Sequence, residues 1–545
     1  MMELDYLIKN GTIIDGSGNP AFQGNVGIYG EKIVYVGSKC MNSKCVIHGE
    51  GLIVAPGFVD VHSHDDLDML VNPGMSHKIL QGITTHACGM CGKSPAPYME
   101  LGDQRALPWK TYVQATMCDR EVPFTWHHFS EYLDALEAAG PAVNTRALVS
   151  HGAIRSCVMG LNDRLPDKEE LQDMKELLAG SLNEGAFGFS TGLMYLPMSF
   201  SDKHELLELC MVAGEYGRGV YPHMRNYREG FLDSVDEFLD ICEKSGASLN
   251  LSHLGVRYKK CWPLMEEALS HIKEAQNRGL NVTFDAIFYC ESSTAIIYLL
   301  PPWANAGGEK ALLQRLEDPA VCERIKAEFE ATANGPVDVS WDLTKDTTQW
   351  DKIVVLGART KEAEEYVGRS IARIAEEMQS DEMEAVFEVI RKNRGAVFIA
   401  MHDIYSYENY KKLLLNGSMI ASDGTPIGSM PHRRKYNVMA HMICQYYKAD
   451  HVISLEKLIR QMTWDGARLL CLDDRGMVKE GMFADLCIFD LERLEEVATD
   501  LEPARSPRGI CHVFVNGKPA VRDGKLTENR TGKVLRYGGK RKISK

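Results

Sequence analysis

The 545-residue sequence has no run of about 18 apolar residues, and it does not open with a basic stretch followed by a long apolar one. Membrane-spanning helices need runs of that length, and secretory signal peptides need that order of charge and hydrophobicity. Positive charge is also not in excess, because 61 basic residues stand against 75 acidic ones. We therefore expect a cytoplasmic protein without membrane or nucleic-acid partners.

The fifteen cysteines are scattered and odd in number, which predicts reduced thiols rather than a disulfide framework. A content of 45% hydrophobic and 25% charged residues is typical of a globular protein with a large core. This balance excludes a disordered chain and favours a small-molecule substrate. The oligomeric state is left open.

Both ends of the chain have the pattern of antiparallel β-structure. Residues 4–50 contain short apolar runs separated by glycine-rich turns, and the same pattern returns near 484–490 and 512–518. We expect residues 1–55 and 476–545 to build one small β-sandwich together.

Between these ends, short apolar strands alternate with helical stretches, as in parallel α/β structures. A closed (β/α)8 barrel of the TIM type needs eight strands. Eight segments qualify, namely 53–62, 82–89, 144–151, 185–190, 219–223, 248–253, 281–286 and 417–423. Residues 396–401 are a ninth candidate, so either they or 281–286 hold the seventh place. The predicted fold class is α/β, with a barrel over 56–475 and a largely helical insertion at about 300–390.

Side chains that bind metals end several of these strands. Reactive groups of such barrels lie at the carboxyl ends of the strands, and residues two apart in a strand point to the same side. The candidates at five strand ends are His62, His64, Cys91, His223, His253 and Asp423. A lone histidine is more often structural, but this joint placement predicts a metal site. Histidine, cysteine and carboxylate together suit zinc better than magnesium or calcium.

The same residues resemble a known family. Residues 55–64, Ala-Pro-Gly-Phe-Val-Asp-Val-His-Ser-His, are similar to the opening signature of the amidohydrolase superfamily. More narrowly, the chain resembles the N-acyl-D-amino-acid deacylases, or D-aminoacylases, nearly from end to end. The segments that carry this resemblance are 81–85, 89–92, 185–193, 223–226, 252–253, 422–424 and 531–536.

The resemblance implies an amidohydrolase barrel with a β-sandwich and zinc-dependent hydrolysis of N-acyl-D-amino acids to a carboxylate and a free D-amino acid. It assigns a tightly held zinc to the residues that match Cys91, His223 and His253. It assigns a second, weaker position to those that match His62, His64 and Asp423. One metal and two metals are both compatible with it, and the D preference rests on the resemblance alone.

The chemistry has its own needs, because an amide is a poor electrophile and water is a poor nucleophile. Zinc lowers the pKa of a bound water to about 7, so that the metal-bound water can attack the amide. Asp423 is expected to accept the proton of that water and to pass it to the leaving nitrogen. A donor such as His62, His64 or Tyr195 is expected to help stabilise the oxyanion.

Substrate recognition departs from the family. Its members place a lysine for the substrate carboxylate two positions after the histidine that matches His253, where this chain has Gly255. A substrate without a free carboxylate is therefore an open alternative. The candidate substrate-binding residues are Tyr195, Arg225, Arg433, Arg434 and Ser292.

Two other functions compete with this reading. A hydrolase of cyclic amides, of the dihydroorotase or hydantoinase kind, predicts a bridging carboxylated lysine, but the second strand leads to Cys91 instead. A catalytically inactive scaffold is expected to lack Asp423 or a histidine, and all of them are present.

Overall fold

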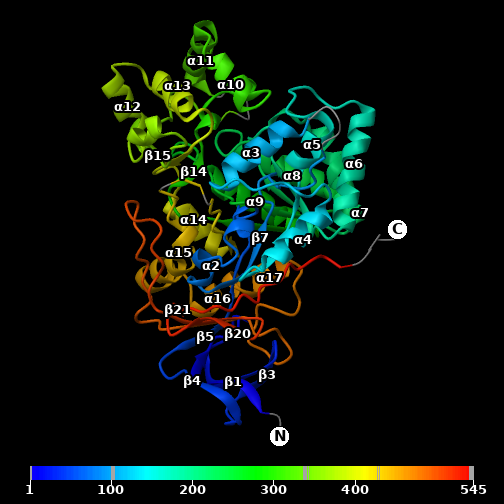
Figure 1. Ribbon diagram of the computed structural model, residues 1–545, viewed down its shortest axis with the longest axis vertical. Coiled ribbons are helices and arrows are strands. Elements are labelled where there is room, and N and C mark those ends of the chain that lie inside the picture. The colour runs from blue at the N-terminus through cyan, green and yellow to red at the C-terminus, as the bar shows by residue number, and fades with distance from the viewer. Residues whose placement is uncertain are drawn as a thin grey trace.

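The computed structural model describes residues 3–99, 105–335, 341, 343–425, 427–428 and 430–538. The outer bounds predicted for the β-sandwich, residues 1 and 545, lie outside this part of the chain. Figure 1 shows a sheet from both chain ends at one end of the molecule and a group of helices, α10–α13, at the other. The parallel strands and the helices that surround them lie between.

Strands from both chain ends form one nine-stranded sheet, here called the terminal sheet. Its strands are β1 (Leu4–Ile13), β2 (Phe22–Tyr29), β3 (Lys32–Gly37), β4 (Ser43–His48), β5 (Ile53–Pro56), β18 (Leu486–Phe489), β19 (Ile510–Val515), β20 (Lys518–Arg522) and β21 (Lys525–Leu526). β18 joins the two halves, because it pairs antiparallel with both β5 and β19. Ile8, Val26 and Phe514 are fully buried in one apolar core beneath it. The predicted association of the chain ends is confirmed, whereas the domain bounds stay predictions.

The predicted barrel is built from eight successive parallel strands. They are β6 (Phe58–Asp60), β7 (Ile83–Cys88), β8 (Asn144–Ala147) continued by β9 (Val149–Ser150), β10 (Gly188–Gly192), β11 (Gly219–His223), β12 (Ser248–Leu251), β13 (Val282–Ala286) and β17 (Met419–Ile420). Each pairs in parallel with the next. The amide of Asp423 donates to the carbonyl of His62 at 2.9 Å, so the end of the last strand meets the end of the first.

Buried polar groups reinforce this closure. The amide of Ser422 donates to Oδ1 of Asp60 at 2.9 Å. The Nζ atom of Lys78 lies 2.5 Å from Oδ2 of Asp60 and 3.0 Å from Oδ2 of Asp65, and none of these three side chains is exposed. The same Nζ atom donates to Oγ of Ser422 at 3.1 Å, so this buried charge cluster contacts the ends of both the first and the last strand.

Helices surround the barrel strands. The longer ones are α3 (Leu107–Met117), α4 (Phe129–Ala139), α5 (His151–Met159), α6 (Lys168–Asn183), α7 (Lys203–Glu215), α8 (Phe231–Ser245), α9 (Leu264–Asn277), α14 (Tyr407–Leu415), α15 (Arg434–His441) and α16 (Leu455–Met462). α6 begins where Asp167 accepts hydrogen bonds from the amides of Glu169 and Glu170, which fixes its first turn. Among the described residues, every helix is too short or too polar to span a lipid bilayer.

Among its described residues, the segment predicted as a helical insertion contains four α-helices, α10 (Glu309–Leu316), α11 (Pro319–Ala331), α12 (Ile371–Met378) and α13 (Glu382–Asn393). The ninth strand candidate is β16 (Phe398–Met401), which pairs antiparallel with β14 (Ser292–Ala295) and β15 (Ile353–Val355) in a separate sheet. The seventh place in the barrel therefore belongs to β13.

The prediction of one strand over 53–62 is wrong. The chain changes sheets at Gly57, so that β5 belongs to the terminal sheet and β6 to the barrel. A Cβ atom at Gly57 would lie 2.1 Å from Oγ1 of Thr84. The first barrel strand thus crosses its neighbour too closely for any side chain at this point, which an apolar run does not reveal.

Candidate metal centre

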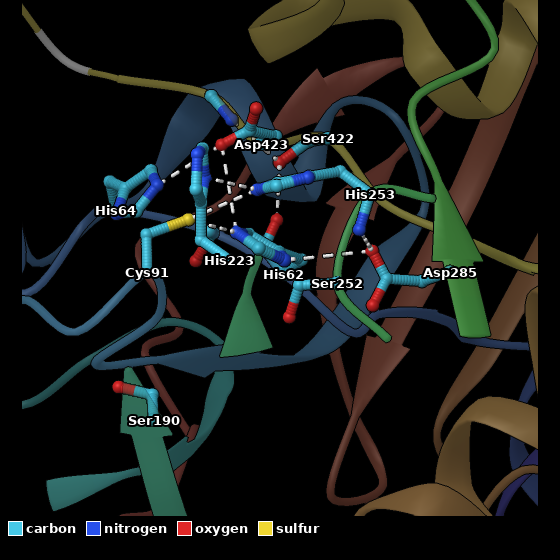
Figure 2. A network of polar contacts seen from close by, with 12 residues as sticks. His62, His64, Cys91, Ser190, His223, Ser252, His253, Asp285, Ser422 and Asp423 are labelled. Carbon is cyan, nitrogen blue, oxygen red and sulfur yellow. Dashed lines mark hydrogen bonds and ion pairs between the residues drawn. The ribbon is translucent and has the colours of Figure 1, made fainter. Parts of the chain in front are cut away.

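All six predicted metal-binding side chains meet at the carboxyl ends of the barrel strands (Figure 2). The ligand atoms of His62, His64, Cys91 and Asp423 lie within 4.8 Å of one another, and so do those of Cys91, His223 and His253. Cys91 belongs to both groups. Its sulfur therefore stands between two potential metal positions.

The first position is formed by one sulfur and two imidazoles. The Sγ atom of Cys91 lies 3.3 Å from Nε2 of His253, and Nδ1 of His223 lies 2.9 Å from the same Nε2 atom. Burial by itself raises the pKa of the Cys91 thiol, but the charges of His62 and His253 and a hydrogen bond from His223 lower it well below its ordinary value. The thiolate is the form of cysteine that binds metals.

His223 complements this thiolate. Burial and the charge of His253 lower the pKa of His223 to about 3, so its imidazole is neutral near pH 7. A neutral imidazole is the form that coordinates a metal ion. The Cys91 thiolate and the neutral His223 imidazole thus have the protonation states that a bound cation requires.

The second position centres on Asp423. Its Oδ1 atom lies 3.0 Å from Nε2 of His64 and 3.6 Å from Nε2 of His62. Its Oδ2 atom lies 2.8 Å from Nη2 of Arg434. Burial would raise the pKa of Asp423, but the Arg434 guanidinium and a hydrogen bond from His64 hold it well below its usual range. Asp423 is therefore a carboxylate at neutral pH and can accept a proton.

Three of the candidate ligands have left-handed backbone conformations. The φ angles are 53° at Cys91, 37° at His253 and 43° at Asp423. Such angles are strained for residues other than glycine and cost about 1–3 kcal/mol each. Each residue follows a strand end, so the sharp turn points its side chain into the site. Gly192 permits this at Cys91, because a Cβ atom there would lie 2.1 Å from the Cys91 carbonyl oxygen.

Asp285, a carboxylate not predicted from the sequence, lies beside the imidazole of His62 and binds the backbone of His253. Oδ1 of Asp285 accepts a hydrogen bond from the amide of His253 at 2.8 Å and lies 3.5 Å from Nδ1 of His62. The side chain of Asn250 donates to Oδ2 at 2.6 Å. Carboxylates behind metal-binding histidines fix the ring orientation. The sequence feature that could have indicated this role is a single acidic residue near the end of the otherwise apolar seventh strand.

Two of the predicted substrate-binding residues lie at the centre. The ring centroid of Tyr195 is 4.5 Å from that of His223. Arg434 contacts Asp423 through both its carboxylate and its carbonyl oxygen, the latter at 2.8 and 3.1 Å. Both residues therefore contact metal-binding side chains directly.

The other three are placed among different neighbours. Nη2 of Arg225 lies 3.2 Å from Oε1 of Glu237, and Nη2 of Arg433 lies 2.9 Å from Oε1 of Glu291. Ser292 is the first residue of β14, outside the barrel strands. Their roles in substrate binding stay predictions.

The position that carries the family lysine is filled from another element. A Cβ atom at Gly255 would lie 3.0 Å from Cε1 of Tyr405, so this ring occupies the space that a side chain at 255 would need. The hydroxyl of Tyr405 accepts a hydrogen bond from Nε of Arg257 at 3.1 Å. The replacement is therefore built into the packing of this wall.

Two segments of the chain, residues 46–286 and 359–520, match the amidohydrolase family. The N-acyl-D-glutamate deacylase of Alcaligenes xylosoxydans xylosoxydans is 30% identical over 98% of this chain and 97% of its own. The D-aminoacylase of the same organism is 28% identical over 97% of each chain.

Solved structures give the same result. The N-acyl-D-glutamate deacylase of Bordetella bronchiseptica, complexed with zinc and a phosphonate mimic of the tetrahedral intermediate, is 28% identical with a TM-score of 0.80 over 98% of this chain and 100% of its own. A D-aminoacylase studied for its binuclear metal centre has a TM-score of 0.82 at 28% identity, over the same shares. A D-hydantoinase with 14% identity and a TM-score of 0.53 shares the fold alone.

Proposed function

The chain belongs to the amidohydrolase family, and we propose that it is a zinc-dependent hydrolase of N-acyl-D-amino acids. The reaction splits the amide bond into a carboxylate and a free D-amino acid. The observation that carries the proposal is the convergence of Cys91, His223 and His253 beside the charged carboxylate of Asp423.

The donor set fits zinc. A thiolate with two imidazoles is a typical zinc ligand set, whereas magnesium and calcium prefer oxygen. We assign the tight ion to Cys91, His223 and His253, with a second, weaker position toward His62, His64 and Asp423. When bound, zinc supplies a Lewis acid that activates water and polarises the amide carbonyl.

The remaining steps belong to side chains. Asp423 takes the proton of the attacking water on its carboxylate and delivers it to the leaving nitrogen. Arg434 keeps that carboxylate charged between turnovers, and His64 orients it from 3.0 Å. Burial and the charge of Cys91 raise the pKa of Tyr195 well above 10, so its hydroxyl keeps a proton to donate to the oxyanion.

We also propose that the protein works in the cytoplasm and binds no nucleic acid. All fifteen cysteines are free thiols, which supports a reducing compartment. The net charge of -14 supports the absence of polyanionic partners.

The test is hydrolysis of paired N-acetyl-D- and N-acetyl-L-amino acids with acidic, basic and apolar side chains, with zinc content measured on the same sample. We expect release of the D product alone, loss of activity after chelation and recovery on adding zinc. A zinc-loaded protein that releases nothing from either series but opens dihydroorotate or a hydantoin would instead be a cyclic amide hydrolase.

A further inference from the structure

A buried lysine beside the metal centre has no acidic partner in the part of the chain that the structure describes. Lys93 follows Cys91 by two residues, and the residue is only 7% exposed. Within the described residues, its ammonium contacts aromatic rings and makes neither a hydrogen bond nor an ion pair. Burying an ammonium group is costly unless an anion compensates its charge.

Three tyrosines form a cage around this ammonium. The Nζ atom of Lys93 lies 4.0 Å from the ring centroid of Tyr195, 5.5 Å from that of Tyr112 and 5.8 Å from that of Tyr298. The hydroxyls of Tyr112 and Tyr298 hydrogen-bond to each other, which fixes two walls of the cage. Ring faces attract a cation but carry no net charge, so the three rings do not neutralise the ammonium that they surround.

This charge lies next to the reacting centre. Tyr195 contacts Lys93 through its ring, and its ring centroid is 4.5 Å from that of His223, a proposed metal ligand. Lys93, Tyr195 and His223 are therefore consecutive neighbours. A group bound at Lys93 would lie one aromatic ring away from the metal-binding side chains.

We propose that Lys93 binds a carboxylate of the substrate and thereby determines specificity. The inference rests on the proposed function, because an N-acyl amino acid always carries an α-carboxylate and an acidic one carries a second carboxylate on its side chain. Each of these carboxylates is an anion that can form an ion pair with the Lys93 ammonium. Tyr405 fills the space at Gly255, where the family has its carboxylate-binding lysine. In this chain, Lys93 in the loop after β7 would supply that positive charge instead.

The test compares Lys93→Met and Lys93→Arg with the wild type, each with its zinc content measured. The substrates are N-acetyl-D-alanine, its carboxamide and N-acetyl-D-glutamate. Lys110→Met is the matched control, because Lys110 also lies over aromatic rings, those of Tyr98 and Phe124, but contacts neither Tyr195 nor His223.

Binding of the α-carboxylate by Lys93 predicts a KM that rises about 10–100-fold in Lys93→Met for both acids and is unchanged for the carboxamide. Binding of a side-chain carboxylate predicts the same rise for N-acetyl-D-glutamate alone. In both cases kcat falls less than KM rises, and Lys93→Arg recovers most of the loss. Unchanged KM for all three substrates in a zinc-loaded, folded Lys93→Met protein would overturn the proposal.

Failure of the proposed function gives a different result. If the zinc-loaded wild type hydrolyses none of the three substrates, the deacylase assignment fails, and titration calorimetry with glutarate still tests Lys93. Binding at least 10-fold weaker in Lys93→Met than in the wild type would support an anion site at this residue. Equal binding in the two proteins, or none in either, would discard it.

Discussion

Arg434 binds both the side-chain carboxylate and the backbone carbonyl of Asp423. Its guanidinium lies 2.8 Å from the Asp423 carboxylate and donates two further hydrogen bonds, of 2.8 and 3.1 Å, to the carbonyl oxygen of the same residue. The side chain and the strained backbone of Asp423 are thus fixed by one partner. Catalytic carboxylates perform best when their geometry is set before the substrate arrives.

Replacing Asp423 by Asn should lower kcat by about 10²–10⁴-fold, because the amide cannot accept a proton. The zinc assigned to Cys91, His223 and His253 should remain near the wild-type amount, since none of its ligands is changed. Steady-state kinetics and metal analysis on the same preparation measure both quantities. Near-normal turnover would remove Asp423 as the base.

Replacing Cys91 by Ala should reduce bound zinc well below one equivalent, because the charged donor of the tight position is lost. Cys88→Ala is the control, since Cys88 is equally buried and three residues away but outside both ligand groups. Metal analysis after dialysis distinguishes the two variants. Stoichiometric zinc in the Cys91 variant would show that its thiol is only a packing group.

Replacing Lys78 by Met should lower the free energy of unfolding by about 3–5 kcal/mol, because Asp60 and Asp65 are left buried without their cation. Adding Asp60→Asn should restore part of the loss, since it removes one of the two stranded charges. Calorimetric unfolding of the two variants and the wild type measures this. A double variant less stable than the single one would contradict the charge explanation.

His86 should make the protein sensitive to acid. Burial and the charge of Lys78 lower the pKa of His86 to about 4, while an unfolded histidine titrates near 6.5. The unfolded state therefore binds the extra proton first, and stability is lost as the pH falls from about 6.5 toward 4.

Between pH 7.5 and 5.5 this loss amounts to about 1 kcal/mol, which His86→Gln should abolish. Urea unfolding of wild type and variant at both pH values measures the difference. His451→Gln is the matched control, because it makes the same substitution at an exposed position. An unchanged pH dependence in His86→Gln would mean that His86 titrates normally.

Much of the site could be predicted from the sequence, because barrel topology brings strand ends together and Cys91, His223, His253 and Asp423 all follow strands. What could not be predicted depends on partners distant in sequence. Nothing near Arg433 indicates that Glu291 binds it, and a lysine after a glycine, as at Lys93, has the pattern of a surface residue.

The missed elements have a similar cause. The apolar run 53–62 has the pattern of a strand in either sheet. The close approach of Gly57 to Thr84 marks where the chain leaves the terminal sheet and enters the barrel. Asp285 follows ordinary strand residues, so its place between the His62 imidazole and the His253 amide emerges only once β12, β13 and β6 are side by side.

The pairing of β5 with β18 also sets an order of events during translation. β5 immediately precedes the segment with His62 and His64, yet its neighbour β18 is made only after Asp485. A nascent chain therefore presents this segment with an unfinished sheet behind it until synthesis is nearly complete. We expect the ion to enter only after release from the ribosome, and chains that stop before β18 to be cleared as unfolded species.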